Sequence, residues 1–179
     1  MQTITDIDFI MLNFLHKNLS CGFLDILMPI ITFLGNAGLI WIAAALILLF
    51  FKKYRKTSFL LMVGLAFCAL IGNLMMKNLV ARARPCFLNT AVDLLISAPT
   101  DYSFPSGHTM SSFTAAVILY HTDKRLGIPA LVLAFLIAFS RLYLYVHFPS
   151  DVVAGAVIGT VIGYVIWMVG NRITHFKTK

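Results

Sequence analysis

Most of this sequence is organised into long runs of apolar residues. A helix needs about 20 such residues to cross a hydrocarbon core of about 30 Å. Overall, 60% of the 179 residues are hydrophobic and 12% are charged, whereas a soluble domain averages about half apolar and about a quarter charged. The apolar runs occupy residues 24–51, 57–76, 109–120, 128–145 and 152–169. They predict an all-α, polytopic membrane helical bundle with about five to six transmembrane segments, forming a single domain over residues 1–179.

Two regions depart from a simple pattern of spans. The run over 24–51 is longer than one crossing and is interrupted at Gly35, Asn36 and Gly38, which predicts a broken or kinked span. Two short membrane-inserted helices are the alternative for this run. Residues 4–18 carry apolar side chains at helical spacing among polar ones, and they predict an amphipathic helix at the membrane interface.

The positive charges are grouped between the apolar runs. The net charge is +7, and nine of the 14 basic residues form three clusters: Lys52, Lys53, Arg55 and Lys56; Lys124 and Arg125; Arg172, Lys177 and Lys179. Because basic residues concentrate on the cytoplasmic side of a membrane, alternating crossings place the C-terminus in the cytoplasm and residues 77–108 and 146–151 outside. This topology explains the charge without a nucleic-acid partner.

The cysteines and the N-terminus indicate no further processing. Cys21, Cys68 and Cys86 have no paired spacing, so neither a zinc site nor a disulfide framework is expected. A disulfide between Cys21 and Cys86 is the less favoured alternative. The N-terminus begins with polar and acidic residues, which predicts no cleaved signal peptide.

Four cations lie at the predicted outer ends of apolar runs: Lys77, Arg82, Arg84 and Arg141. A charge there is costly, so a functional role is the default hypothesis. Lys77 and Arg84 are two helical turns apart, which predicts that both project from one helix face, about 10 Å apart along the axis, with Pro85 ending the helix. Both can then bind one anion. Contact with lipid headgroups is the alternative, and it is our interpretation of Arg82.

Two further motifs lie on the same predicted side. Pro105-Ser106-Gly107-His108 precedes the run at 109–120, so a helix starting there would direct free N–H groups at an anion, with His108 beside it. An ordinary loop-to-helix transition is the alternative. In the second motif, His147 and Asp151 are four residues apart, which allows the carboxylate to orient the ring. Pro149 makes a helix start near that residue, with His147 in the preceding turn.

Together these segments supply what phosphoryl transfer requires: a nucleophile, cations for the phosphoryl oxygens and an acid for the leaving group. The spacing Lys77-x6-Arg84-Pro85, Pro105-Ser106-Gly107-His108 and Ser140-Arg141-x5-His147-x3-Asp151 resembles the three-part signature of the type 2 phosphatidic acid phosphatase (PAP2) superfamily. The signature covers residues 77–151, and every motif position matches.

The resemblance implies a role for each motif residue. His147 would be the nucleophile that forms a phosphohistidine, Asp151 would orient it, and His108 would protonate the leaving oxygen and later activate water. The substrate's phosphoryl group would be bound by Lys77, Arg84, Ser106, Gly107 and Arg141. The family needs no metal or other cofactor, and the outer acids of this chain form no Mg²⁺-type arrangement.

The resemblance also implies a bacterial plasma-membrane hydrolase whose active site faces outside. Undecaprenyl diphosphate is the favoured substrate, with hydrolysis to undecaprenyl phosphate in cell-wall biogenesis. Phosphatidylglycerophosphate or phosphatidic acid is the first alternative, and a non-catalytic protein that binds or transports lipid phosphates is the second. The sequence leaves the oligomeric state open.

Overall fold

The computed structural model describes the backbone of residues 2–176 and the side chains of residues 3–172. Its helices follow the apolar runs closely. They are α1 (Gln2–Leu19), α2 (Gly22–Leu34), a 3-10 turn (Asn36–Gly38), α3 (Leu39–Leu49), a second 3-10 turn (Lys52–Tyr54), α4 (Arg55–Cys68), a π-helical segment (Ala69–Met76), α5 (Lys77–Val80), α6 (Pro85–Leu88), α7 (Gly107–Thr122), α8 (Lys124–Tyr143) and α9 (Pro149–Phe176).

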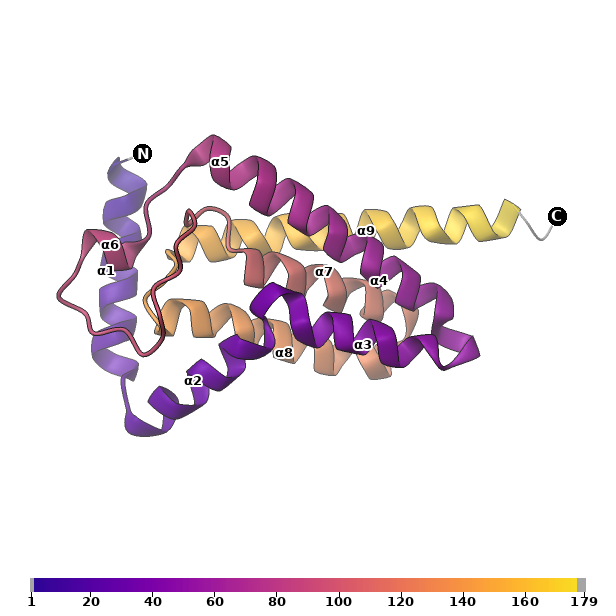
Figure 1. Ribbon diagram of the computed structural model, residues 1–179, viewed down its shortest axis with the longest axis horizontal. Helices are drawn as coiled ribbons and strands as arrows, with labels where there is room; N and C mark the ends of the chain where they lie inside the picture. Colours follow the sequence, from indigo (N-terminus) through magenta and orange to yellow (C-terminus); the bar gives the residue numbers. More distant parts are fainter. Residues whose placement is uncertain (1, 177–179) are drawn as a thin grey trace.

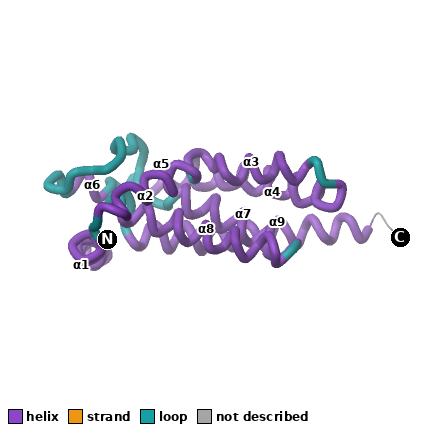
Figure 2. The backbone as a smooth tube through the Cα atoms, turned by 90° about the horizontal axis from the view of Figure 1, so that it is seen from below, coloured by secondary structure: helices purple, strands orange, loops and turns teal. Residues whose placement is uncertain are grey.

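The long helices run side by side along one axis, and α1 stands across one end of them (Figure 1). Viewed at right angles, α3 and α4 form one layer and α7, α8 and α9 form the other, with the loops near α6 gathered at the end where α1 lies (Figure 2). The prediction of an all-helical membrane bundle is confirmed. The chain turns that carry Lys52–Tyr54 and Asp123 lie at the other end.

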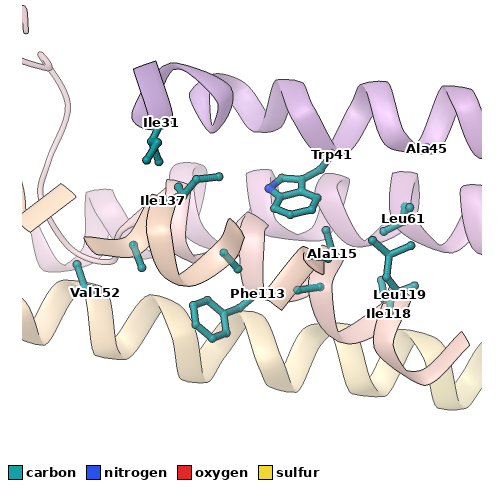
Figure 3. Packing of buried hydrophobic residues seen from close by; sticks show 14 of the residues in the cluster. Ile31, Trp41, Ala45, Leu61, Phe113, Ala115, Ile118, Leu119, Ile137 and Val152 are labelled. Atoms are coloured by element: carbon teal, nitrogen blue, oxygen red, sulfur yellow. The ribbon is translucent and has the colours of Figure 1, made fainter. Parts of the chain in front are cut away.

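Helix α7 is the centre of the bundle. It contacts α8, α9, α4 and α3, and ten of its 16 residues are buried. Phe113, Ala115, Ile118 and Leu119 pack among side chains from neighbouring helices (Figure 3). In the same core, the indole N–H of Trp41 donates to Ser112 Oγ at 2.9 Å.

Close packing of α9 on α7 depends on three glycines at four-residue spacing. A Cβ on Gly159 would lie 2.3 Å from the carbonyl oxygen of Met110. A Cβ on Gly155 or Gly163 would lie 2.7 Å from the backbone oxygen of Ser106 or Thr114, respectively. Small residues let helix backbones approach within a membrane, where the hydrophobic effect does not drive association. This contact holds the start of α9 beside the start of α7.

The predicted break in residues 24–51 is confirmed. Helices α2 and α3 meet at an angle of 47° around the 3-10 turn, where Ala37 and Gly38 have positive φ of 50° and 72°. The bent pair fits one broken span or a re-entrant loop, so both interpretations of this run remain.

Among the described residues, three stretches are long and apolar enough to cross a membrane by themselves: Lys52–Leu88, Lys124–Tyr143 and Pro149–Arg172. The bent pair raises the number to four. Helix α7, predicted as a short apolar run, has 16 residues and lies enclosed by other helices, so it falls below the length of a full crossing.

The amphipathic helix predicted at residues 4–18 forms α1. Its apolar residues Ile4, Ile7, Ile10, Met11 and Phe14 are exposed, whereas Asp8 and Leu12 are buried against the bundle. The basic residues Lys52, Lys53, Lys124 and Arg125 lie at the bundle end far from α1. Lys177 and Lys179 lie outside the described residues.

Candidate active site

The predicted site residues meet in a cavity at the α1 end of the bundle. The cavity has a volume of about 500 Å³, and its lining includes Lys77, Arg84, His108, Arg141 and His147. Gly107 also contributes to the lining. Ser106 does not: it is fully buried, and its hydroxyl accepts a hydrogen bond from Thr109 Oγ1 at 2.9 Å. As the N-cap of α7, Ser106 stabilises the start of the helix that carries Gly107 and His108.

The expectation that Lys77 and Arg84 share one helix is wrong. Helix α5 ends at Val80, and Ala81 adopts a left-handed conformation with φ of 46°. Arg84 is extended, and Pro85 begins α6 instead of ending a helix. The reason is steric: proline is favoured at the first helical position, and it pushes the preceding residue out of the helical region.

Lys77 and Arg84 nevertheless reach one anion, the carboxylate of Asp101. Arg84 Nη2 donates to Asp101 Oδ1 at 2.6 Å, and Lys77 Nζ donates to Oδ2. Burial raises the pKa of Asp101, but the hydrogen bonds and charges of Lys77 and Arg84 outweigh this effect and lower the pKa to about 2. The Asp101 side chain is 52% exposed, so it is an accessible carboxylate within the cationic part of the cavity.

Arg141 supplies a third cation from the end of α8. Its side chain is buried, and one guanidinium nitrogen donates to Thr32 Oγ1 at 2.5 Å. Its Nε is buried and has no hydrogen-bond partner among the described residues. An unsatisfied buried donor is costly, and Arg141 is one of the residues that line the cavity.

His147 lies in the turn between α8 and α9, as predicted, because α9 begins at Pro149. Its Nδ1 is 3.6 Å from Asp151 Oδ2, too long for a direct hydrogen bond. Ser103 Oγ lies between the two groups, 3.4 Å from Nδ1 and 2.5 Å from Oδ2, to which it donates. The sequence pattern misses Ser103, which orients the ring together with Asp151.

The opposite ring nitrogen of His147 faces Arg84. Arg84 Nη1 is 3.0 Å from Nε2, and a guanidinium can only donate. Nε2 therefore carries the lone pair, and the ring proton of neutral His147 is on Nδ1. Complete burial lowers the pKa of His147 well below its ordinary value, and the charges of Arg84, Arg141 and Lys77 lower it further. The ring is thus held neutral with its lone pair towards the cations.

His108, the second histidine of the site, is the second residue of α7 and contacts the break between α2 and α3. Its Nε2 is 2.8 Å from Asn36 Oδ1. The adjacent Gly35 permits this approach, because a Cβ there would lie 2.8 Å from His108 Cδ2. The interruption at Gly35 and Asn36 is visible in the sequence, but its contact with His108 is not.

The interpretation of Arg82 as a headgroup contact is wrong. Arg82 forms ion pairs with Asp8 and Asp151, each at 2.7 Å, and its guanidinium stacks on Phe148, 4.1 Å from the ring centroid. The left-handed conformation of Ala81 ends α5, and Arg82 after it is directed at these buried carboxylates. Its partners are 74 and 69 residues away in sequence, beyond any helical spacing.

The next features are the possible metal ligands and the three cysteines. Over the described part of the chain, no three His, Cys, Asp or Glu side chains gather as metal ligands. Cys21 is exposed, Cys68 and Cys86 are buried, and all three are free thiols.

The chain is similar to known membrane phosphatases in sequence and in fold. The PAP2 superfamily matches residues 55–174. An undecaprenyl-diphosphatase from Sulfolobus acidocaldarius is 36% identical over 138 residues, which cover 75% of this chain and 66% of that protein, about two thirds of its length. A decaprenylphosphoryl-5-phosphoribose phosphatase from Mycobacterium tuberculosis is 33% identical over 132 residues, covering 73% of this chain and 72% of the relative.

A solved structure agrees over nearly the whole chain. The transmembrane PAP2-type phosphatidylglycerolphosphate phosphatase from Bacillus subtilis superposes with a TM-score of 0.80 and 26% sequence identity. The superposition covers 97% of this chain and 89% of the other. The similarity therefore includes α1 and α2, which lie outside the residues matched by the family.

Proposed function

Because this chain belongs to the PAP2 superfamily, we propose that it is an integral membrane phosphatase that releases phosphate from a lipid diphosphate or monophosphate through a phosphohistidine. The observation that carries this proposal is the single cavity lined by Lys77, Arg84, Arg141 and both histidines. Such a cavity offers positive charge for phosphoryl oxygens beside a neutral imidazole, two of the groups that phosphoryl transfer requires.

Binding begins with the cations. Lys77 and Arg84 already hold the two oxygens of the Asp101 carboxylate, so two phosphoryl oxygens can take the same donors when they replace it. Arg141 Nε supplies a further donor, and the backbone N–H of Gly107 lies at the start of α7, where a helix favours an anion.

His147 Nε2 then attacks phosphorus. A bond forms between Nε2 and phosphorus while the bond from phosphorus to the lipid oxygen, or to the bridging oxygen of a diphosphate, breaks. Arg84 Nη1 turns from Nε2 to a phosphoryl oxygen, which frees the lone pair. The ring gains positive charge, and Asp151 stabilises that charge through Ser103, which lies beside Nδ1.

His108 completes both halves of the reaction. Burial lowers the pKa of His108, and the neighbouring cations lower it further, to about 2; the negative charge of a bound phosphate opposes this effect of the cations. The protonated ring gives its proton to the leaving oxygen, and the neutral ring then takes a proton from the water that attacks the phosphohistidine. Asn36 holds the ring near this position. Breaking the bond between Nε2 and phosphorus returns His147 to its starting form and releases inorganic phosphate.

A lipid substrate is supported by a second cavity beside the first. This cavity, of about 320 Å³, shares Lys77 and His108 with the phosphate site. It continues between helices past apolar residues that include Leu65, Ala69 and Met110. A hydrocarbon chain attached to the phosphate can lie along this lining, whereas a free sugar phosphate would leave it empty.

Undecaprenyl diphosphate is the favoured substrate because the Sulfolobus relative, at 36% identity, is an undecaprenyl-diphosphatase. A glycerolipid phosphate is the second candidate because the Bacillus structure that superposes over 97% of this chain is a phosphatidylglycerolphosphate phosphatase. Phosphate release from undecaprenyl diphosphate, phosphatidylglycerophosphate and phosphatidic acid, measured side by side in detergent, decides between them. A clear preference for a glycerolipid would replace the favoured substrate.

The same assay tests the chemistry. Release should continue in the presence of a chelator, and His147→Ala should abolish both release and the acid-labile phosphoenzyme. A protein that only binds or transports lipid phosphates would retain bound lipid and release no phosphate. Activity of His147→Ala near the wild-type rate would refute the phosphohistidine.

For localisation, we propose a bacterial plasma membrane, with the site facing outside and the C-terminus in the cytoplasm. The basic turns lie at the bundle end opposite the site, as the positive-inside rule requires. In a cysteine-free background, Thr90→Cys in the site loop should react with an impermeant thiol reagent in intact cells, and Lys53→Cys should be protected. The reverse labelling would invert the topology.

A further inference from the structure

Helix α1 reaches the back of the candidate active site through one arginine. Arg82 Nη2 donates to Asp8 Oδ2, and Arg82 Nη1 donates to Asp151 Oδ1, both at 2.7 Å. Asp8 also accepts from the backbone N–H of Ser150 at 2.9 Å. A continuous chain of charged hydrogen bonds thus runs from α1 to the carboxylate behind His147.

All three charged groups are shielded from water. Their side chains are 5% exposed for Asp8, 17% for Arg82 and 0% for Asp151. At such low exposure an ion pair is screened little, and removing one partner leaves a buried charge unpaired. The stacking of Arg82 on Phe148 fixes the guanidinium plane between the two carboxylates.

Each oxygen of Asp151 has its own partners. Oδ2 accepts from Ser103 Oγ at 2.5 Å and from the backbone N–H of Phe148 at 2.9 Å, on the side that faces His147. Oδ1 accepts from Arg82. Arg82 therefore fixes the rotation of the carboxylate and offsets its charge without contacting His147.

We propose that Asp8 and Arg82 are positioning residues for the nucleophilic histidine, so that α1 contributes to catalysis through Asp8. Arg82 holds Asp151 in the orientation that serves Ser103 and His147, and Asp8 holds Arg82. This inference rests on the proposed function. It assigns a role to a helix outside residues 55–174, the part of the chain that the family matches.

The test uses the full-length protein in detergent, with phosphate release from undecaprenyl diphosphate and, if that lipid is refused, from phosphatidylglycerophosphate. The variants are Arg82→Gln, Arg82→Lys, Asp8→Asn and the double variant Asp8→Asn/Arg82→Gln. Asp6→Asn is the matched control, because Asp6 is exposed on the same helix. Thermal unfolding of each variant, followed in the same detergent, identifies any that fail to fold.

We expect kcat to fall about 10- to 100-fold in Arg82→Gln, as for loss of a charged hydrogen bond, with KM within about two-fold because phosphate and lipid do not touch Arg82. Arg82→Lys should recover part of the loss, and Asp8→Asn should lower kcat less. The double variant should be no slower than Arg82→Gln, since both residues act through one chain of contacts.

The pH profile separates positioning from general loosening. Loss of the Arg82 charge leaves the Asp151 charge less balanced, which favours protonated His147, so the acid limb of kcat/KM should move to higher pH. Loss of the Asp8 charge should move the limb by a smaller amount to lower pH. Loosened packing would shift neither limb in a charge-dependent direction.

The outcomes are distinct. If wild type releases phosphate while all four variants match Asp6→Asn, the positioning role is wrong and the proposed function stands. Equal shifts of the acid limb in Arg82→Gln and Asp8→Asn, or additive losses in the double variant, would also overturn it. If wild type releases phosphate from none of the lipids, the proposed function itself fails.

Discussion

Arg84 Nη1 lies 3.0 Å from Nε2 of His147, and this contact fixes both the tautomer and the direction of the imidazole lone pair. The same arginine donates from Nη2 to Asp101 at 2.6 Å and from Nη1 to the carbonyl of Val146 at 2.7 Å. Arg84 thus connects the anion site, the nucleophile and the turn that carries the nucleophile. The fork of a guanidinium can make these contacts together, whereas an ammonium cannot.

Replacing Arg84 by lysine should therefore cost more than a conservative change of charge suggests. We expect Arg84→Lys to lower kcat/KM for lipid phosphate by about 100-fold or more, because the fixed donors aimed at developing negative charge are lost. Arg55→Lys, at the far end of the bundle and exposed, is the matched control. Activity of Arg84→Lys within about two-fold of wild type would show that positive charge alone is sufficient.

Asp101 should act as a tethered competitor for the phosphate site. Asp101→Asn keeps the shape of the side chain but removes the charge that occupies Lys77 and Arg84. The inhibition constant of orthophosphate should fall by about ten-fold, since charge-assisted hydrogen bonds are freed for the ion. Asp93→Asn, exposed in the same loop, should leave the constant unchanged. A weaker inhibition by orthophosphate would instead mean that Asp101 is needed to hold the cations in place.

Asn36 should matter most when the leaving group is poor. Asn36→Ala removes the acceptor that holds His108, so we expect about a ten-fold loss of kcat on a lipid phosphate, part of what general acid catalysis contributes. With p-nitrophenyl phosphate the loss should be smaller, because its leaving group needs no proton. Asn18→Ala on α1 is the control. An equal loss on both substrates would show that Asn36 does not act through the proton donor.

The pH dependence of kcat/KM should report the neutral form of His147. Burial and the surrounding cations lower the pKa of this group, so the acid limb should lie below about pH 6.5, the ordinary histidine value. Asp101 opposes that lowering, and Asp101→Asn should therefore move the limb to still lower pH on the same substrate. A limb that moves upward in Asp101→Asn would contradict this assignment.

The lowered pKa of His147 also determines how the stability of the folded protein changes with pH. His147 stays neutral in the folded protein at pH values where the unfolded chain already gains a proton. Its contribution to the free energy of unfolding is therefore fully present above about pH 6.5 and is lost as the pH falls below that value. Asp101, whose pKa is lowered from 3.8 to about 2, contributes to stability above pH 3.8 and loses that contribution as the pH falls towards 2.

By itself, the sequence determined the features that depend on local composition and spacing. Apolar run length predicted the helical membrane bundle, and Gly35, Asn36 and Gly38 predicted the break in the second helical region. Pro149 after His147 predicted where α9 begins. These features are set by solvent, backbone sterics and helical period, all of which act within a few residues.

Only the tertiary structure decided which side chains meet. Helical spacing placed Lys77 and Arg84 on one helix, but Pro85 excludes the helical conformation at Arg84, and the two cations converge through Asp101 instead. Ser103, Asn36 and Asp8 reach His147, His108 and Arg82 from segments 44 to 74 residues away in sequence. The spacing of residues within one helix cannot predict such contacts, because they form only when packed helices bring distant turns to the same end of the bundle.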